Sequence, residues 1–308
     1  MMNSKSAGKI VVCAYHNVGC RCLAELLRQG ARVEAVFTHE DSPTEQIWFG
    51  SVAELALRNG IPCYFTDVSL PENIALLENI RPDFLFSFYY RFMIKKEVLD
   101  IPSRGALNMH GSYLPKYRGR VPVNWAVING ERETGATLHY MVERPDAGDI
   151  VDQEKVAIEF ADTAFDVFTG VTNAAERIIA RSWPLLREGR AGRKVMNLAE
   201  GSYFGGRKPE DGRIYWDRKA VDIYNLVRGV THPYPGAFSI LDGRKILVWT
   251  AWPVEGRGEP GLVVSESPLL VGAGEGLLEI RSLQVDSETE ETAEEFTARR
   301  PVAGKKFE

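Results

Sequence analysis

The feature that most constrains this chain is the alternation of short apolar segments with segments of helical periodicity between Lys9 and Ser182. Between the apolar runs, leucines recur at helical spacing after Gly19, and Ser51 with Glu54 forms a capping box that predicts a helix start. Strands alternating with helices predict an α/β fold, a doubly wound parallel sheet with helices on both faces. The predicted strands are 9–15, 33–38, 61–65, 83–88, 106–109 and 136–142, and the longest predicted helix is 163–182.

The pattern changes after about residue 200, where a Gly-rich polar linker covers 200–213. A helix follows, with Val221, Tyr224 (or Ile223) and Val227 predicted to face inward. Short strands at 237–241, 244–249, 261–264, 269–271 and 277–283 then predict a small barrel, with a hairpin turn at Asp242-Gly243. The segment from Asp286 to Glu295 has six acids and no base, so we expect it to be solvated and partly disordered. The predicted domains are 1–203 and 204–308.

Composition excludes several classes of protein. The net charge is −5, and the part from Gly206 onward carries 14 basic and 17 acidic residues, so a nucleic-acid-binding surface is not expected. No apolar run is long enough to span a membrane, and the polar stretch from Met1 to Lys9 lacks the apolar core of a signal peptide. Four cysteines in a chain of this length are no disulfide framework. We therefore expect a cytoplasmic protein.

Outside the segment 108–120, the histidines do not indicate a metal site and the glycines do not indicate a dinucleotide-binding site. His16, His39, His139 and His232 are too scattered to predict a metal site, so we expect packing or solvated roles and no bound metal. The segment after the first strand has one glycine, Gly19, where a dinucleotide-binding loop needs three. A nucleotide-binding redox module is therefore disfavoured, and nicotinamide binding would reveal it.

The densest group of polar residues runs from Asn108 to Arg120, where a predicted strand ends. Asn108 and His110 lie on one side of an extended segment, and ligands of parallel sheets bind at the carboxyl ends of strands. A histidine can take a proton from an amine at neutral pH, and an asparagine amide can donate to a developing oxyanion. Asp146 either pairs with His110 and holds its ring, or belongs to a plain turn in which Gly148 supplies the positive φ.

The pattern Asn108-x-His110-x-Ser112-x-Leu114-Pro115-x-x-Arg118-Gly119, followed by Asp146-x-Gly148-Asp149, resembles the signature of the 10-formyltetrahydrofolate-dependent formyltransferases. The resemblance extends over nearly the whole chain. It implies a Rossmann-like catalytic domain followed by an OB-like barrel, and 10-formyltetrahydrofolate as co-substrate without a metal. It implies that His110 is the acid/base, that Asn108 stabilises the transition state and that Asp146 supports the protonated histidine. The folate contacts that it implies are Phe92, Met93, Ile94, Arg120, Val142, Glu143, Arg144, Pro145 and Asp146.

Several phrases, such as Ala14-Tyr15-His16 and Ser87-Phe88-Tyr89-Tyr90-Arg91, resemble the branch of the family that formylates UDP-4-amino-4-deoxy-L-arabinose in lipid A modification. The resemblance implies a nucleotide-sugar partner. On the basis of positive charge alone, Lys116, Arg118 or Arg207 is expected to contact its pyrophosphate. Tyr113, Glu143 and Pro145 depart from that branch. The branch continues into an NAD-dependent decarboxylase domain, so fusion or association with such a domain is an expectation, and self-association as a homo-oligomer is left open.

Two other activities belong to the same family. Methionyl-tRNA formyltransferase shares the fold, the three polar residues and the donor, but an RNA acceptor requires basic surface. Here the second half is net acidic, and so is the loop His39–Glu45. Formyltetrahydrofolate hydrolase uses a similar trio with water, and it usually carries an additional regulatory domain. An amino-sugar acceptor is therefore favoured.

Overall fold

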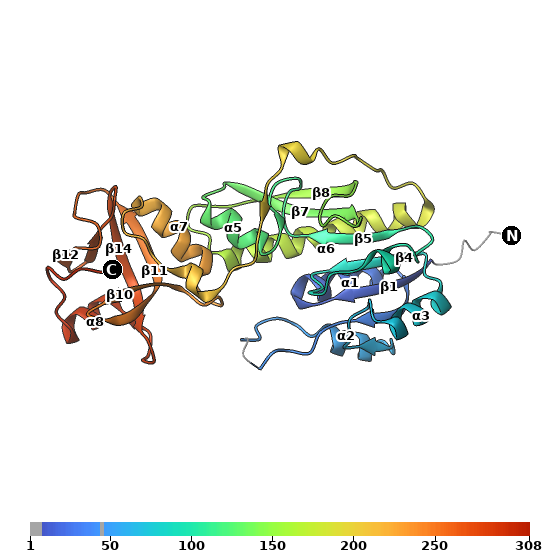
Figure 1. The fold of residues 1–308 in the computed structure, drawn as a ribbon, viewed down its shortest axis with the longest axis horizontal. Helices are drawn as coiled ribbons and strands as arrows, with labels where there is room; N and C mark the ends of the chain where they lie inside the picture. Colours follow the sequence, from blue (N-terminus) through green and yellow to red (C-terminus); the bar gives the residue numbers. More distant parts are fainter. Residues whose placement is uncertain (1–7, 44–45) are drawn as a thin grey trace. The chain divides into compact units, whose positions relative to one another are not determined.

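The computed structural model describes residues 8–43 and 46–308 (Figure 1). These residues pack as two units. The first comprises the chain up to Pro122 together with Thr134–Ala157 and Phe168–Phe204, and the second comprises Val123–Glu133, Ile158–Val167 and Gly205–Glu308. Most of the polar segment Met1–Lys9, and Thr44 and Glu45 of the acidic loop, lie outside the described residues.

The first unit is built on a sheet with the strand order β3-β2-β1-β4-β5-β7-β8. The strands from β3 to β5 are parallel, as predicted, whereas β7 runs antiparallel to β5. The segment 150–157, for which the sequence analysis predicted no strand, adds β8 at one edge. The strands are β1 (Lys9–Ala14), β2 (Arg32–Phe37), β3 (Cys63–Tyr64), β4 (Phe84–Phe88), β5 (Ala106–His110), β7 (Glu133–Tyr140) and β8 (Ile150–Ala157).

Both faces of this sheet are covered by helices, which confirms the doubly wound fold. Val11 and Leu85 share one apolar cluster with Leu77 of α3 and Val98 of α4. On the opposite face, Phe84 and Phe86 contact Trp183 of α6. All of β4 is buried, as expected for a central parallel strand. The helices are α1 (His16–Arg28), α2 (Val52–Arg58), α3 (Pro71–Ile80), α4 (Lys96–Leu99), α5 (Pro122–Ile128) and α6 (Ala164–Glu188).

The chain between the two units is more ordered than the predicted linker. β9 (Tyr203–Phe204) pairs in parallel with β6 (Arg118–Gly119), so the loop that follows β5 is held by backbone hydrogen bonds. Short 3-10 turns, η1 (Leu198–Glu200) and η2 (Pro209–Gly212), flank this pair along the chain. None of the helices in the described part of the chain combines the length and the hydropathy needed to cross a bilayer.

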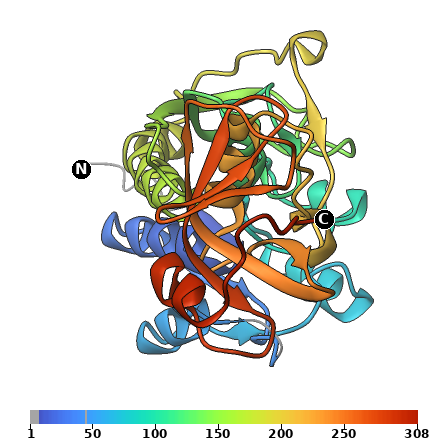
Figure 2. The same ribbon diagram turned by 90° about the vertical axis from the view of Figure 1, so that its left-hand side faces the viewer.

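The second unit contains an antiparallel sheet with the order β10-β11-β14-β13-β12, to which β15 adds beside β14 (Figure 2, orange to red). Asp242 and Gly243 both have positive φ, as the predicted hairpin turn requires. Residues 305–308 hydrogen-bond to both edges, at Ile240 and at Val263, and thereby join them in a barrel-like closure. The elements are α7 (Ala220–Val230), β10 (Ala237–Leu241), β11 (Arg244–Val254), β12 (Val263–Glu266), β13 (Leu269–Gly272), β14 (Leu277–Val285), β15 (Glu291–Thr292) and α8 (Ala293–Arg299).

The predicted inward face of α7 is correct except at Val221. Ile223, Tyr224 and Val227 are buried against the sheet, but Val221 is 38% exposed. Ile223 rather than Val221 completes the apolar stripe, because it lies four residues before Val227 on the same helix face.

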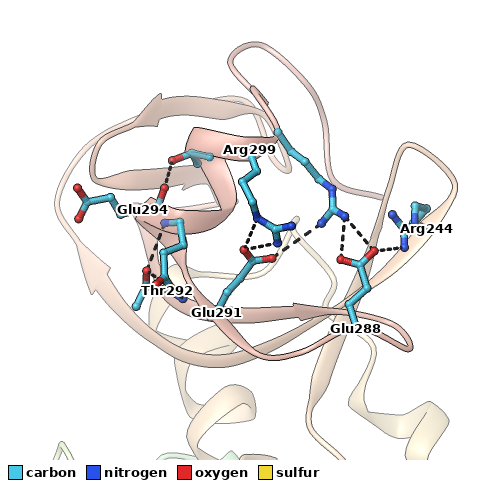
Figure 3. Close-up of polar contacts among 9 residues, drawn as sticks. Arg244, Glu288, Glu291, Thr292, Glu294 and Arg299 are labelled. Atoms are coloured by element: carbon cyan, nitrogen blue, oxygen red, sulfur yellow. Dashed lines mark hydrogen bonds and ion pairs between the residues drawn. The ribbon is translucent and has the colours of Figure 1, made fainter.

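For the acidic segment 286–295, the expectation of solvation is correct for most residues, which are exposed, but the expectation of partial disorder is wrong. The segment forms β15 and the start of α8, and its carboxylates pair with arginines from elsewhere in the unit (Figure 3). Arg299 donates to Glu291 at 2.5 Å, whereas Glu288 accepts from Arg300 at 2.7 Å and from Arg244 at 2.6 Å. The hydrogen bonds from these two arginines lower the pKa of Glu288. Local charge counting misses the partners because they lie outside the acidic run.

Glu291 is the most buried acid of this network, with a side chain only 7% exposed. Glu291→Gln should lower the free energy of unfolding by about 2 kcal/mol, because it leaves charged arginine donors without their carboxylate. Urea denaturation checks this value. The control is Glu294→Gln, at an exposed position in the same segment, which should shift stability by less than about 0.5 kcal/mol. Equal effects of the two substitutions would contradict the assigned role of Glu291.

Candidate active site

The carboxyl end of β5 carries Asn108 and His110, and the structure brings both side chains to Asp146. β5 lies between β4 and β7, and its register places Asn108 opposite His139 of β7. Residues two apart on a strand point to the same face. His110 is 6% exposed, so its ring is held within the protein rather than in solvent.

Both ring nitrogens of His110 face an acceptor. Nε2 lies 2.8 Å from the carbonyl oxygen of Tyr117, and Nδ1 lies 3.4 Å from Oδ1 of Asp146. The Tyr117 carbonyl is fixed by the loop that contains it, since the hydroxyl of Ser112 donates to the carbonyl oxygens of Lys116 and Tyr117. A doubly protonated imidazole in this position therefore donates on both sides.

Asp146 lies on the loop after β7 and is the residue that joins the group together. Its Oδ1 is 3.5 Å from Nδ2 of Asn108, and its Oδ2 accepts a 2.9 Å hydrogen bond from the N–H of Gly119. Burial by itself raises the pKa of Asp146, but the charges of His110 and His139 and the hydrogen bonds from His139 and Gly119 hold that pKa well below its usual range. The carboxylate is therefore ionised at neutral pH.

His139 is a member of this group that sequence reasoning missed. Its ring is 1% exposed, with Nδ1 2.8 Å from the carbonyl oxygen of Tyr140. Its Nε2 lies 3.3 Å from Nδ2 of Asn108 and 3.5 Å from Oδ1 of Asp146. The expectation of a packing role is correct about burial but omits these polar contacts. Only the antiparallel pairing of β7 with β5 could have revealed them.

Among residues 8–43 and 46–308, no three His, Cys, Asp or Glu side chains gather in a way that could hold a metal ion. The two imidazoles and the carboxylate of the group described above instead contact one another, the amide of Asn108 and backbone groups. The group is thus arranged to hold and exchange protons.

Comparison with protein families identifies the chain. The model of the formyl transferase family matches residues 15–182, and the model described as formyl transferase, C-terminal domain, matches residues 207–301. The chain belongs to the formyl transferase family. The expectation of a formyl-transferring enzyme, drawn from the motif around His110, is confirmed at this level.

Solved structures with the same fold include sugar N-formyltransferases. The N-formyltransferase from Helicobacter canadensis, in complex with folinic acid and dTDP-3-aminofucose, is 19% identical over 92% of this formyltransferase and 99% of its own chain, with a TM-score of 0.67. WlaRD is a sugar 3N-formyl transferase crystallised with dTDP and 5-N-formyl-THF. It is 20% identical over 92% of this formyltransferase and 99% of its own chain, with a TM-score of 0.69. HypX from Aquifex aeolicus, in complex with tetrahydrofolic acid, is 19% identical over 97% of this chain but 49% of its own, with a TM-score of 0.64. At these identities the likeness establishes the shared fold.

The residues nominated for folate in this formyltransferase form two segments that leave the same part of the sheet. Tyr90, just before the first segment, and Met141, just before the second, pack against one apolar cluster. Lys96, at the start of α4, is within electrostatic reach of Glu143. The segments are thus neighbours, although they are far apart in sequence.

Exposure separates these nominated residues into two kinds. Phe92, Met93 and Val142 are 42%, 66% and 47% exposed, so their apolar surfaces are open to a ligand. Ile94 is only 9% exposed and belongs to the apolar core, so its side chain is not available to a ligand. The other nominated residues are at least partly exposed: Arg120, Glu143, Arg144, Pro145 and Asp146.

His39 supports the first of these segments rather than acting as a site residue. Its Nε2 accepts a 2.9 Å hydrogen bond from the N–H of Arg91, and its ring contacts Tyr90 and Phe92. Burial, with the charge of Arg91, lowers the pKa of His39 to about 4, so the ring is a neutral acceptor at pH 7. This agrees with the predicted packing role.

The turn at Asp146 differs from the simple turn considered in the sequence analysis. The positive φ belongs to Asp146 itself, at 51°, and not to Gly148. Gly148 is required for another reason, because a Cβ there would overlap the carbonyl oxygen of Tyr140. The glycine therefore allows two backbone segments to approach closely beside the site.

Gly148→Ala should accordingly lower the free energy of unfolding by about 1–3 kcal/mol, since the backbone around Tyr140 must shift to admit the methyl group. Chemical denaturation measures the change. Gly192→Ala is the matched control, because a Cβ at Gly192 meets no heavy atom within 4 Å. A neutral result at both positions would contradict the close approach at Gly148.

Proposed function

We propose that this protein transfers a formyl group from 10-formyltetrahydrofolate to the amine of a nucleotide-linked amino sugar. The observation that carries the proposal is the convergence of Asn108, His110 and Asp146 at the carboxyl end of β5, with distances of 3.4–3.5 Å to the shared carboxylate. Family membership supplies the reaction type, and this group supplies side chains suited to proton transfer and to stabilising an oxyanion.

The residues nominated for the donor fit a folate. The exposed apolar side chains of Phe92, Met93 and Val142 offer surface that a flat pterin ring would cover. Bound there, the folate supplies the formyl carbon to which the acceptor amine adds. Proteins of this fold have been crystallised with folinic acid, with 5-N-formyl-THF and with tetrahydrofolic acid, which is consistent with such a donor.

The protein's part in the reaction is the movement of one proton. The amine loses a proton as its bond to the formyl carbon forms, and the folate nitrogen gains one as its bond to that carbon breaks. In the proposal, His110 exchanges this proton at Nε2, which releases the carbonyl oxygen of Tyr117 to reach the substrate, while Nδ1 faces Asp146. Asp146 holds the ring by Nδ1 and balances the charge of its protonated form.

Asn108 is proposed to stabilise the oxyanion that develops from the formyl oxygen. Its Nδ2 contacts with His139 and Asp146 are long, at 3.3 and 3.5 Å, so an oxyanion would compete well for the same hydrogens. His139 holds the amide from the neighbouring strand, and we assign it a positioning role through Asn108.

For the acceptor, we propose UDP-4-amino-4-deoxy-L-arabinose, as used by the formyltransferase domain of ArnA in lipid A modification, which this sequence resembles. The net acidic second half of the chain favours a small nucleotide sugar over tRNA. Two of the solved structures were obtained with dTDP or with a dTDP-linked amino sugar, which supports a nucleotide-linked amino sugar as the class of acceptor.

The test is an assay of tetrahydrofolate release at neutral pH. The purified protein and 10-formyltetrahydrofolate are mixed in turn with UDP-4-amino-4-deoxy-L-arabinose, with a panel of dTDP-amino sugars and with methionyl-tRNA. Turnover with the UDP-pentose supports the full proposal. Turnover only with another nucleotide sugar retains the acceptor class and rejects the pentose, and turnover only with charged tRNA rejects the amino-sugar acceptor.

A further inference from the structure

Arg118 is a buried arginine that pairs with no carboxylate among the described residues. It lies in β6, in the loop that follows His110, and its residue is 6% exposed. Its Nε is fully buried without a hydrogen-bond partner, and within the described residues no carboxylate forms an ion pair with its guanidinium. Among the described residues, the charged group faces the ring of Tyr203, 5.9 Å from the guanidinium carbon.

The other buried arginine, Arg228, shows what a structural role looks like here. It is also 6% exposed, but its Nε donates to Asn225 at 2.9 Å and its Nη1 donates to the carbonyl oxygen of Asp162 at 2.7 Å. Removing a guanidinium from water without such partners is costly. Arg118 therefore lacks the compensation that Arg228 has, and an anionic ligand would supply it.

The backbone on either side of Arg118 is bonded to the candidate active site. The carbonyl of Tyr117 faces Nε2 of His110, and the N–H of Gly119 donates to Asp146. The backbone of Arg118 is therefore held beside the candidate active site. The pairing of β6 with β9 fixes this position, because the N–H of Arg118 donates to the carbonyl oxygen of Ser202 at 3.0 Å.

Lys116, Arg118 and Arg207 are the cations proposed from charge for the pyrophosphate. Of these, Arg118 is the one with a buried donor that has no hydrogen-bond partner among the described residues. Arg207 stacks over Trp125 and donates to the carbonyl oxygen of Asp211, so its guanidinium is already engaged. Lys116, in the same loop as Arg118, is exposed, and in the described part of the chain no acid pairs with it. Lys116, Arg118 and Arg120 lie in one loop, and none of the three pairs with an acid among the described residues. Several cations in one loop match the charge of a diphosphate better than that of a single carboxylate.

We propose that Arg118 binds a phosphoryl oxyanion of the nucleotide-linked acceptor and so determines the preference for a diphosphate. The inference rests on the proposed function for the identity of the acceptor, and it deepens that function by naming a specificity residue. Guanidinium and phosphate geometries match, and the bond is strengthened by exclusion of water from the buried site.

The experiment compares Arg118→Met with the matched control Arg228→Met in the full chain. Binding of UDP and of uridine, measured by titration calorimetry, isolates the phosphoryl contribution without requiring turnover. Wild-type protein should bind UDP at least tenfold more tightly than uridine, and Arg118→Met should remove that ratio. Since methionine fills the space without a charge, Arg118→Met should also raise Tm, by about 2–4 °C, whereas Arg228→Met should lower it.

Each outcome of this experiment either supports or overturns the proposed role of Arg118. Loss of the UDP-to-uridine ratio together with an unchanged or raised Tm supports the proposal. A retained ratio overturns it, as does a lowered Tm in Arg118→Met, which would mean that the arginine is structural. Weaker binding of 5-formyltetrahydrofolate with UDP binding unchanged also overturns it, since the anion is then a folate carboxylate. If wild-type protein binds UDP through Arg118 but formylates no amino sugar, the proposed function fails and the anion site stands.

Discussion

Replacing His110 with alanine should lower kcat for formyl transfer by about 10³-fold or more while the protein stays folded. The ring is the group in the candidate site that can both accept the amine proton and return it, and general acid–base catalysis contributes about 10²–10⁴-fold. Loss of its contribution to oxyanion stabilisation adds to this effect. The measurement is tetrahydrofolate release under saturating donor and acceptor.

Two controls make this result interpretable. His232→Ala removes a half-exposed ring that stacks on Trp249 in the second unit, and it should leave kcat within a factor of about 2. Thermal unfolding of His110→Ala should show a cooperative transition, because the ring contributes few apolar contacts. Near-normal turnover by a folded His110→Ala variant would reject the proposed mechanism.

The second large effect is expected for Asp146→Asn. The carboxylate is shared by His110, Asn108, His139 and the N–H of Gly119, so its neutralisation should disturb every member of the group. We expect kcat to fall by about 10²–10⁴-fold. The substitution also removes an ionised group whose pKa lies well below its usual range in the folded protein.

That lowered pKa predicts a pH dependence with a definite sign. A carboxyl with a folded-state pKa below its unfolded value of about 3.9 stabilises the fold above that pH, and it loses this contribution as pH falls through the folded-state pKa. Wild-type protein should therefore be more stable than Asp146→Asn at pH 7, and the difference should shrink below about pH 4. Urea denaturation from pH 7 to pH 3 measures it.

Asp286→Asn provides the matched comparison, because Asp286 is exposed and, among the described residues, its carboxylate forms no hydrogen bond or ion pair. Its stability difference from wild type should be near zero at both pH values. A difference for Asp146→Asn that stays constant with pH would show that the carboxylate contributes through its shape and hydrogen bonds rather than through its charge.

Local patterns in the sequence were sufficient for much of the fold. The apolar, β-branched run at the start of the chain became β1, and the capping box at Ser51 is present, with the hydroxyl accepting from the N–H of Glu54 at 3.2 Å. Asp242-Gly243 formed the expected hairpin turn. These predictions succeeded because each depends on residues a few positions apart, whose backbone preferences and hydrogen bonds are local.

Two predictions failed because the deciding features do not show in a short window of sequence. The acidic segment 286–295 is ordered because Arg244, Arg299 and Arg300 meet its carboxylates. The strand β8 was missed because its residues are only partly buried and lack a regular apolar alternation. Neither feature can be read from a window of neighbouring residues.

By itself the sequence determined the alternating strands and helices, the family motif and the trio Asn108, His110 and Asp146 as the residues to examine. Only the tertiary structure decided that β7 pairs antiparallel with β5, which sets His139 opposite Asn108. It also decided that Nε of Arg118 is buried without a hydrogen-bond partner among the described residues. The physical reason is that strand pairing and burial are non-local: they depend on which segments meet in space, and a short stretch of sequence carries no record of that choice.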